Sequence, residues 1–221
     1  DTVTKKNSHE EILRKFNEEK IDILIGTQMI VKGHHFPDVT LVGVVSADGS
    51  LSIDDYRASE RTFDLLVQVA GRAGREKLPG NVIIQTYNPD NYSIQYSKKQ
   101  NYEEFYNVEI KLRKQLRYPP FCDIIMFGIS GEREEIVSKT ANQLYANLHK
   151  KIQQEDIAAN ILKPLPAPID KIKNRYRWRI IIKSEVNDKL IEIINECLYD
   201  KELLKNNARV IADINPTNMM W

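Results

Sequence analysis

Short apolar runs alternate with long helical stretches in the first half of the chain, and this alternation most constrains its fold. Val39 to Val45 and Asn81 to Thr86 are short, apolar and rich in β-branched residues, which is typical of strands. Ile21 to Ile25, closed by Gly26, fits a strand that is buried on both faces. A helical stretch, Asp55 to Arg72, lies between the second and third runs. Strand, helix and strand in alternation predict a parallel sheet with right-handed crossovers, and therefore an α/β fold.

The loops that follow these runs are where a ligand is expected, because open α/β sheets bind ligands at the carboxyl ends of their strands. The loop after the first run, residues 26–38, supplies a hydroxyl, an amide, an amine and bare backbone from Thr27, Gln28, Lys32 and Gly33. These groups are the usual ones for contact with phosphate. A turn explains the glycines of this loop but not the other side chains.

Two further positions near these loops have simpler structural explanations. Asp48 follows the second run and either takes part in coupling or caps the next turn, and the cap is favoured. The pair His34 and His35 has no third metal ligand nearby, which favours residues of a turn or a DNA-facing surface. The sequence therefore predicts no metal site.

The stretch Gln68 to Arg75 places an amide and two guanidiniums on one helical face, because residues 68, 72 and 75 are spaced i, i+4 and i+7. Two glycines, Gly71 and Gly74, are costly inside a helix but allow a ligand to approach the backbone. Arg72 and Arg75 are fork-shaped permanent cations that suit a phosphate. A helix that ends in a glycine cap with cations near its C-terminus explains the same residues equally well.

The second half of the chain predicts a separate α+β domain. Tyr118-Pro119-Pro120 ends a helical connector, which divides the chain into a first lobe over 1–100, a connector over 101–120 and a C-terminal domain over 121–221. Expected strands are residues 121–129, 160–168, 176–183 and 208–214, and expected helices are 132–152 and 187–204. Their order is β-α-β-β-α-β, which is that of a ferredoxin-like fold.

One strand of this second domain carries a row of arginines. Arg175, Arg177 and Arg179 share one side of the strand, and Tyr176 and Trp178 share the other. Arginines beside aromatic rings suit contact with a nucleic-acid backbone and stacking on bases. The alternative is an antiparallel sheet with one face in water. DNA contact is the favoured interpretation.

Composition excludes several classes of protein. Lys and Arg number 32 against 31 Asp and Glu, so a nucleic-acid-binding surface must be local. Cys122 and Cys197 are far apart without metal-binding spacing, which favours two buried thiols. No apolar run approaches the ~18 residues of a membrane span, so no membrane partner is expected. The chain begins with Asp1 rather than Met, and we expect it to be part of a longer protein.

The motifs resemble those of a known family. Gly26 to Gly33 resembles the fifth motif of superfamily-two helicases, and Gln68 to Arg75, Q-x-x-G-R-x-G-R, resembles the sixth. The sixth motif alone is shared by many helicases, but its combination with further segments is specific. Those segments, residues 34–39, 58–61, 85–89, 118–121 and 213–216, are similar to the primosomal protein N′ (PriA) family of replication-restart helicases.

The resemblance implies that the first half is a second RecA-like motor lobe. In this family ATP and Mg²⁺ lie between two lobes, and the sequence has no Walker A loop, G-x-x-x-x-G-K-[ST], of the first lobe. It implies that Arg72 or Arg75, or both, act as an arginine finger, and that Gln68 positions the attacking water or the γ-phosphate. It also implies no ATP hydrolysis by this chain alone.

The resemblance assigns roles to the other motif residues as well. Thr27, Gln28 and Lys32 are implied to contact DNA, and Gly33 and Gly71 to lie near the nucleotide. His35 stands where many helicases have an aspartate, which weakens the case for a carboxylate contact to ribose. The family's zinc module uses clustered cysteines, so zinc is expected in the longer protein and not in this chain.

The resemblance further implies an ATP-dependent 3′→5′ DNA helicase that recognises stalled or recombined forks and begins primosome assembly. Its implied partners are forked or single-stranded DNA, single-stranded DNA-binding protein and other primosome proteins, in the bacterial cytoplasm at the nucleoid. One alternative is a branch-migration type of translocase, against which Tyr118 to Phe121 and the β-α-β-β-α-β order argue. Another is a DNA- and protein-binding scaffold without a motor, against which Gln68, Arg72 and Arg75 argue.

Overall fold

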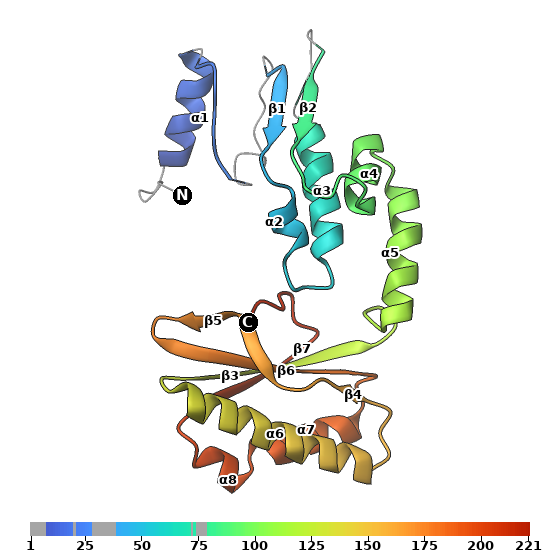
Figure 1. Ribbon diagram of the computed structural model, residues 1–221, viewed down its shortest axis with the longest axis vertical. Helices are drawn as coiled ribbons and strands as arrows, with labels where there is room; N and C mark the ends of the chain where they lie inside the picture. Colours follow the sequence, from blue (N-terminus) through green and yellow to red (C-terminus); the bar gives the residue numbers. More distant parts are fainter. Residues whose placement is uncertain (1–7, 20, 28–38, 72, 74–78) are drawn as a thin grey trace. The chain divides into compact units, whose positions relative to one another are not determined.

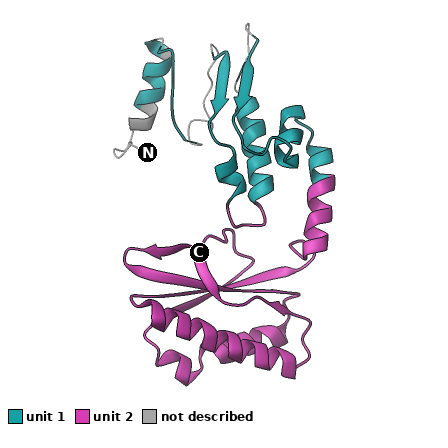
Figure 2. Ribbon diagram, viewed as in Figure 1, with its two compact units in different colours: residues 1–52, 58–106 teal, residues 53–57, 107–221 magenta. Residues whose placement is uncertain are grey.

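The computed structural model describes residues 8–19, 21–27, 39–71, 73 and 79–221, and it divides into two compact units. Unit 1 comprises Asp1–Ser52 and Ala58–Tyr106, and unit 2 comprises Ile53–Arg57 and Asn107–Trp221 (Figure 2). Unit 2 is thus discontinuous in sequence, because five of its residues come from the connection between two helices of unit 1.

Unit 1 is built around two parallel strands. β1 (Leu41–Val44) pairs with β2 (Asn81–Ile84), with Leu41 opposite Asn81 and Val44 opposite Ile84 (Figure 1). The predicted parallel pairing of these two runs is confirmed. The helices of this part of the chain are α1 (Ser8–Glu18), α2 (Asp48–Leu51), α3 (Ala58–Ala70), α4 (Tyr92–Lys99) and α5 (Tyr102–Leu116), of which α5 ends in unit 2.

α3 packs its apolar residues against neighbouring elements of unit 1. Leu66 packs with Ala47 and Ile94 in one cluster. Phe63 stacks on Phe105 of α5 with ring centroids 4.3 Å apart. Phe105 is 2% exposed and packs inside the protein, whereas its neighbours Tyr102 and Tyr106 are 58% and 47% exposed.

The predicted strand Ile21 to Ile25 is wrong for this structure. Residues 21–27 form neither a helix nor a strand, and Ile23 and Ile25 are 74% and 89% exposed. A strand requires a hydrogen-bonded neighbour, and both described strands of unit 1 pair only with one another. An apolar run therefore does not become a strand from its own composition.

The predicted helix from Asp55 begins three residues later, at Ala58. The Asp55 carboxylate accepts a hydrogen bond from the backbone N–H of Arg57 at 2.9 Å. Such a contact two residues ahead stabilises a turn rather than a helix. Residues 53–57 are a turn-rich segment of unit 2 as a result.

Unit 2 is an antiparallel sheet with helices on one face. Its elements are β3 (Asp123–Gly131), α6 (Glu134–Gln154), β4 (Asn160–Ile161), β5 (Leu165–Ile172), β6 (Arg175–Ser184), α7 (Asp188–Leu198), α8 (Lys201–Leu204) and β7 (Arg209–Ile214). The strands are ordered β4-β6-β3-β7, and β5 also pairs with β6. α6 and α7 lie side by side beneath the sheet (Figure 1).

Two details of unit 2 differ from the prediction. The predicted edge strand at residues 160–168 is two strands, β4 and β5, that both pair with β6. The predicted helix at residues 187–204 is interrupted at Tyr199 and Asp200, because the Asp200 carboxylate accepts from the N–H groups of Glu202 and Leu203 and begins α8. The β-α-β-β-α-β order is otherwise present.

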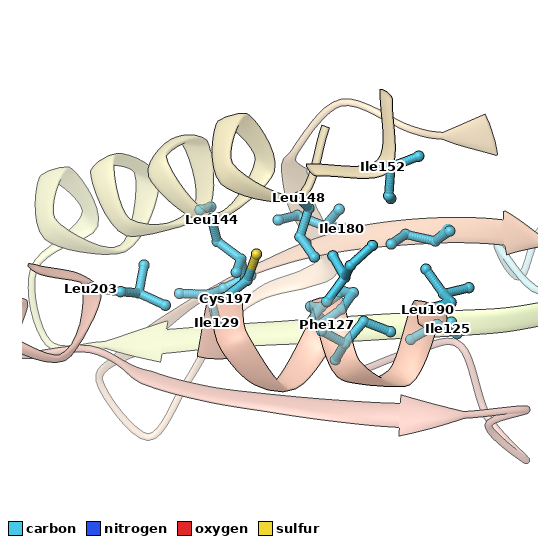
Figure 3. Close-up of a cluster of buried hydrophobic side chains, with 14 of the residues drawn as sticks. Ile125, Phe127, Ile129, Leu144, Leu148, Ile152, Ile180, Leu190, Cys197 and Leu203 are labelled. Atoms are coloured by element: carbon cyan, nitrogen blue, oxygen red, sulfur yellow. The ribbon is translucent and has the colours of Figure 1, made fainter. Parts of the chain in front are cut away.

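The sheet of unit 2 is covered on both faces. On the helical side, Phe127 and Ile180 pack against Leu144, Leu148 and other wholly buried side chains (Figure 3). On the opposite side, Ile124, Met126 and Ile181 pack with Met219, Tyr56, Tyr118 and Trp221. The alternative of one face in water is therefore wrong, because segments distant in the sequence cover it.

Candidate functional site

A carboxylate joins the two loops that leave the carboxyl ends of β1 and β2, where a ligand was expected. Asp48 accepts hydrogen bonds from the Thr86 hydroxyl at 2.9 Å and from the Tyr87 N–H at 3.1 and 3.2 Å. Thr86 in turn accepts from the N–H of Asn88 at 3.0 Å. The two loops are thus held together by one side chain.

The predicted cap role of Asp48 is wrong. α2 begins at Asp48 itself, its N-cap is Ala47, and no side chain caps it. Burial raises the pKa of the Asp48 carboxyl, but the hydrogen bonds from Thr86 and from backbone N–H groups outweigh burial and hold the pKa below its usual value. Asp48 is accordingly a carboxylate at neutral pH.

The sixth-motif stretch begins at the C-terminal end of α3. Leu66 and Val69 are buried, while Gln68 is exposed, as the helical spacing predicted. Gly71 follows the helix and donates its N–H to the Val67 carbonyl at 3.0 Å. The Gln68 amide is therefore presented by a helix whose opposite side is fixed in the core of unit 1.

The other motif residues are only partly described. Thr27 is exposed and lies in the irregular segment 21–27. The remaining sites predicted for unit 1 lie outside the described residues, and they are Gln28, Lys32, Gly33, Arg72 and Arg75.

The arginine row of β6 is engaged inside unit 2. Arg179 is 7% exposed, donates to the Met219 carbonyl at 2.8 Å and forms an ion pair with Asp54. Arg177 donates to the carbonyls of Ile169 and Met220, both at 3.2 Å. These two guanidiniums bind the protein's own backbone in this structure.

Arg175 has a different environment. It is exposed, and it donates a 3.5 Å hydrogen bond to the Ser130 carbonyl. Near the same end of β6, the Lys171 ammonium lies 4.4 Å from the Tyr176 ring centroid. Of the three arginines in the row, Arg175 is the one that presents its side chain to solvent.

Sequence reasoning missed the residues that engage this row. The helix expected from Asp55 gives Asp54 and Asp55 no partner in β6, and no sequence motif marks Met219 or Trp221. One signal was available in Gly128, a glycine inside an apolar strand, which indicates close approach of another group. A Cβ at Gly128 would lie 2.4 Å from the Trp221 ring.

Comparison with known proteins identifies the chain. Residues 1–77 match the helicase conserved C-terminal domain, and residues 114–217 match the primosomal protein N C-terminal domain. "Replication restart protein PriA" of Bacillus subtilis is 43% identical over 222 residues, which is 100% of this chain and 27% of that protein. The chain belongs to the PriA family.

Other PriA proteins match to a similar extent. That of Synechocystis is 38% identical over 99% of this chain and 26% of its own length. That of Chlamydia muridarum is 39% identical over 98% of this chain and 28% of its own length. The chain therefore spans about a quarter of the length of the PriA relatives that it matches, and the match to the primosomal C-terminal domain places it in their C-terminal region.

Within the described residues, no group of three or more His, Cys, Asp or Glu side chains could hold a metal ion. No helix in this same part of the chain is long and apolar enough to cross a membrane.

Proposed function

We propose that this chain forms the second RecA-like lobe and the C-terminal domain of an ATP-dependent 3′→5′ DNA helicase that restarts replication at stalled or recombined forks. The observation that carries this proposal is the 43% identity to a PriA protein along the entire chain, including the sixth motif that begins at the exposed Gln68. The ferredoxin-like assignment of unit 2 belongs to the same proposal, and the strand order β4-β6-β3-β7 supports it.

In this proposal unit 1 stabilises charge that develops during phosphoryl transfer. ATP and Mg²⁺ are held mainly by a first lobe, and the nucleotide supplies the transferred phosphoryl group. At least one of Arg72 and Arg75, which follow α3 in the sequence, donates to the phosphoryl oxygens, a role worth about 10³–10⁵ in rate. The exposed amide of Gln68 orients the attacking water or the γ-phosphate. Gly71 and Gly33 allow close approach of the nucleotide.

The same unit binds DNA through residues that follow position 25 in the sequence. Thr27, which is exposed, together with Gln28 and Lys32, contacts the phosphate backbone of the translocated strand. Closure and opening of the two lobes would then move these contacts along the DNA strand.

For unit 2 we propose DNA contact through the exposed end of β6. Arg175 supports this role best, because Arg177 and Arg179 already bind backbone carbonyls. The name of the matched domain, primosomal protein N, supports partners among primosome proteins. We propose single-stranded DNA-binding protein as a further partner. We place the protein in the bacterial cytoplasm at the nucleoid, and we assign zinc to the longer protein rather than to this chain.

The motor role is tested in the longer protein that contains this chain. Arg72→Ala and Arg75→Ala are made separately, with Lys98→Ala on the exposed face of α4 as a control of equal charge change. The finger variant is expected to lose DNA-stimulated ATP hydrolysis by about 10³-fold or more while still binding ATP. Normal turnover in both variants contradicts the proposal.

Two further measurements separate the units. The isolated chain is expected to hydrolyse no ATP, and DNA-stimulated turnover by it refutes the division of the site between two lobes. Arg175→Glu is expected to reduce fork-DNA affinity and to lower the slope of log affinity against log salt by about 1. Lys98→Glu serves as the control. An equal change of affinity and salt dependence in both variants contradicts DNA contact through Arg175 of β6.

A further inference from the structure

The face of the unit 2 sheet that carries Arg177 and Arg179 is closed by a short segment, Pro216–Trp221, which we call the strap. Pro216 and Met219 are buried, and Met219 packs against Ile124, Met126 and Ile181. The strap is therefore part of the interior of unit 2.

The seat of the strap is shaped to receive an indole ring. A Cβ at Gly128 would lie 2.4 Å from Cδ2 and Cε2 of Trp221, which is closer than atoms can approach. The Arg177 guanidinium lies 4.7 Å from the Trp221 ring centroid, within the range of a cation–π contact. Glycine at position 128 and arginine at position 177 thus explain how a large ring rests directly on the sheet.

Three arginines bind the strap through its backbone carbonyls. Arg57 donates to Pro216 at 2.7 Å, Arg179 to Met219 at 2.8 Å and Arg177 to Met220 at 3.2 Å. Donors on guanidiniums form the stronger class of hydrogen bond. Because the acceptors are carbonyls, these contacts fix the path of the strap rather than its side chains.

Residues 53–57 complete this arrangement from a distant part of the sequence. Asp55, whose side chain is 0% exposed, accepts from Arg57 at 3.2 Å and from the Met219 N–H at 3.3 Å. Asp54 forms the ion pair with Arg179. Residues 53–57 and the strap therefore share Arg179, and Arg57 and Asp55 join the two segments directly.

Residues 53–57 are also the connection between two helices of unit 1. They connect α2, which begins at Asp48, with α3, which ends just before Gly71. We propose that the strap is a latch that holds residues 53–57 in the C-terminal unit and thereby controls the α2–α3 connection of the motor lobe. The control of the motor rests on the proposed function, whereas the latch itself does not.

The latch is tested by Gly128→Ala, which removes the room for the Trp221 ring, and by Trp221→Ala, which removes the ring. Gly43→Ala is the matched control, because that glycine also lies in a strand and a Cβ there has nothing within 4 Å. Hydrogen exchange is measured in the whole chain. In both strap variants we expect exchange to rise about tenfold or more at residues 217–221 and at 53–57, with α6 still protected.

The two variants are also combined. Because the clash needs both side chains, Gly128→Ala is expected to add little once Trp221 is alanine. Unchanged exchange at residues 217–221 contradicts the claim that the Trp221 ring on Gly128 fixes the strap to the sheet. A rise there without a rise at residues 53–57 overturns the latch.

The motor arm uses the longer protein. DNA-stimulated ATP hydrolysis is expected to change severalfold in both strap variants and to stay unchanged in Gly43→Ala. Turnover within about twofold of the parent, with exchange raised at residues 53–57, overturns control of the motor. Absence of turnover in the parent protein instead refutes the proposed function, and the exchange result still decides the latch.

Discussion

The two units bury similar apolar strands to very different extents. In unit 2, Ile124, Ile125 and Phe127 of β3 are all 0% exposed, because helices cover one face and the strap and residues 53–57 cover the other. In unit 1, Leu41 of β1 and Ile83 of β2 are 57% and 62% exposed. The difference shows that burial of a strand is decided by what the rest of the chain places over it, and not by its own residues.

This comparison predicts that large-to-small changes have unequal costs in the two units. Leu144→Ala empties a wholly buried position in unit 2 and is expected to lower the free energy of unfolding by about 2–5 kcal/mol. Ile83→Ala in unit 1 is expected to change it by about 0.5 kcal/mol or less. Both tryptophans, Trp178 and Trp221, belong to unit 2, so their fluorescence during denaturation reports that unit.

Hydrogen exchange at β1 and β2 reports unit 1 in the same samples. Equal losses from the two substitutions contradict the comparison, because they mean that the exposed face of the β1–β2 pair is buried in solution.

The second prediction concerns acid and the buried carboxylate of unit 2. Burial raises the pKa of Asp55, but hydrogen bonds from Arg57 and Met219 and the charge of Arg57 outweigh it and lower the pKa. A lowered pKa stabilises the folded state above the unfolded pKa of about 3.9, and this contribution is lost as pH falls through the folded value. Asp55→Asn is expected to reduce stability by about 1–3 kcal/mol at pH 7 and to flatten the acid dependence.

Asp170→Asn, at an exposed position of β5, is the control and is expected to leave both the stability and its pH dependence unchanged. Parallel acid profiles of the parent and Asp55→Asn would show that this carboxylate does not act in the way described. Asp123, whose pKa is lowered by hydrogen bonds from Asn215 and Val186, remains in both proteins and keeps part of the acid sensitivity.

The third prediction concerns the carboxylate of unit 1. Asp48→Asn keeps an oxygen that can accept from Thr86 but replaces Oδ2, which accepts from the Tyr87 N–H at 3.1 Å, with an amide group that can only donate. We expect faster hydrogen exchange at residues 86–88 without loss of the β1–β2 pairing. Asp90→Asn, at an exposed position of the same loop, provides the comparison. Equal exchange in the two variants means that Asp48 does not hold the loops together.

Local patterns predicted much of this structure. The parallel pair β1–β2, the stripe Val137, Ala141, Leu144, Leu148 and Ile152 of α6, and the outward side of Gln68 all follow from periodicity. These features depend on residues within one element or between elements with a regular connection.

The features that sequence reasoning missed depend on distant contacts. Nothing near Arg179 in the sequence indicates that Asp54 lies 125 positions away as its partner, or that Met219 covers it. A row of arginines on a strand therefore fits a DNA surface and a backbone clamp equally well until the covering segments are known. The strand predicted for Ile21 to Ile25 is wrong because pairing also depends on distant residues, and no described strand pairs with this segment.

The smallest effect is expected at the two thiols, which both belong to unit 2. Burial raises the pKa of Cys197 to about 11, and burial also raises the pKa of Cys122. The Cys197 thiol therefore stays protonated at pH 8, so a thiol reagent is expected to label Cys197 slowly in the native chain. Leu144→Ala, which destabilises the surrounding core, is expected to accelerate labelling of Cys197, whereas Ile83→Ala in unit 1 leaves it unchanged. Rapid labelling of Cys197 in the native chain would mean that the interior of unit 2 opens as readily as the exposed strands of unit 1, and the contrast between the two units would then describe packing but not stability.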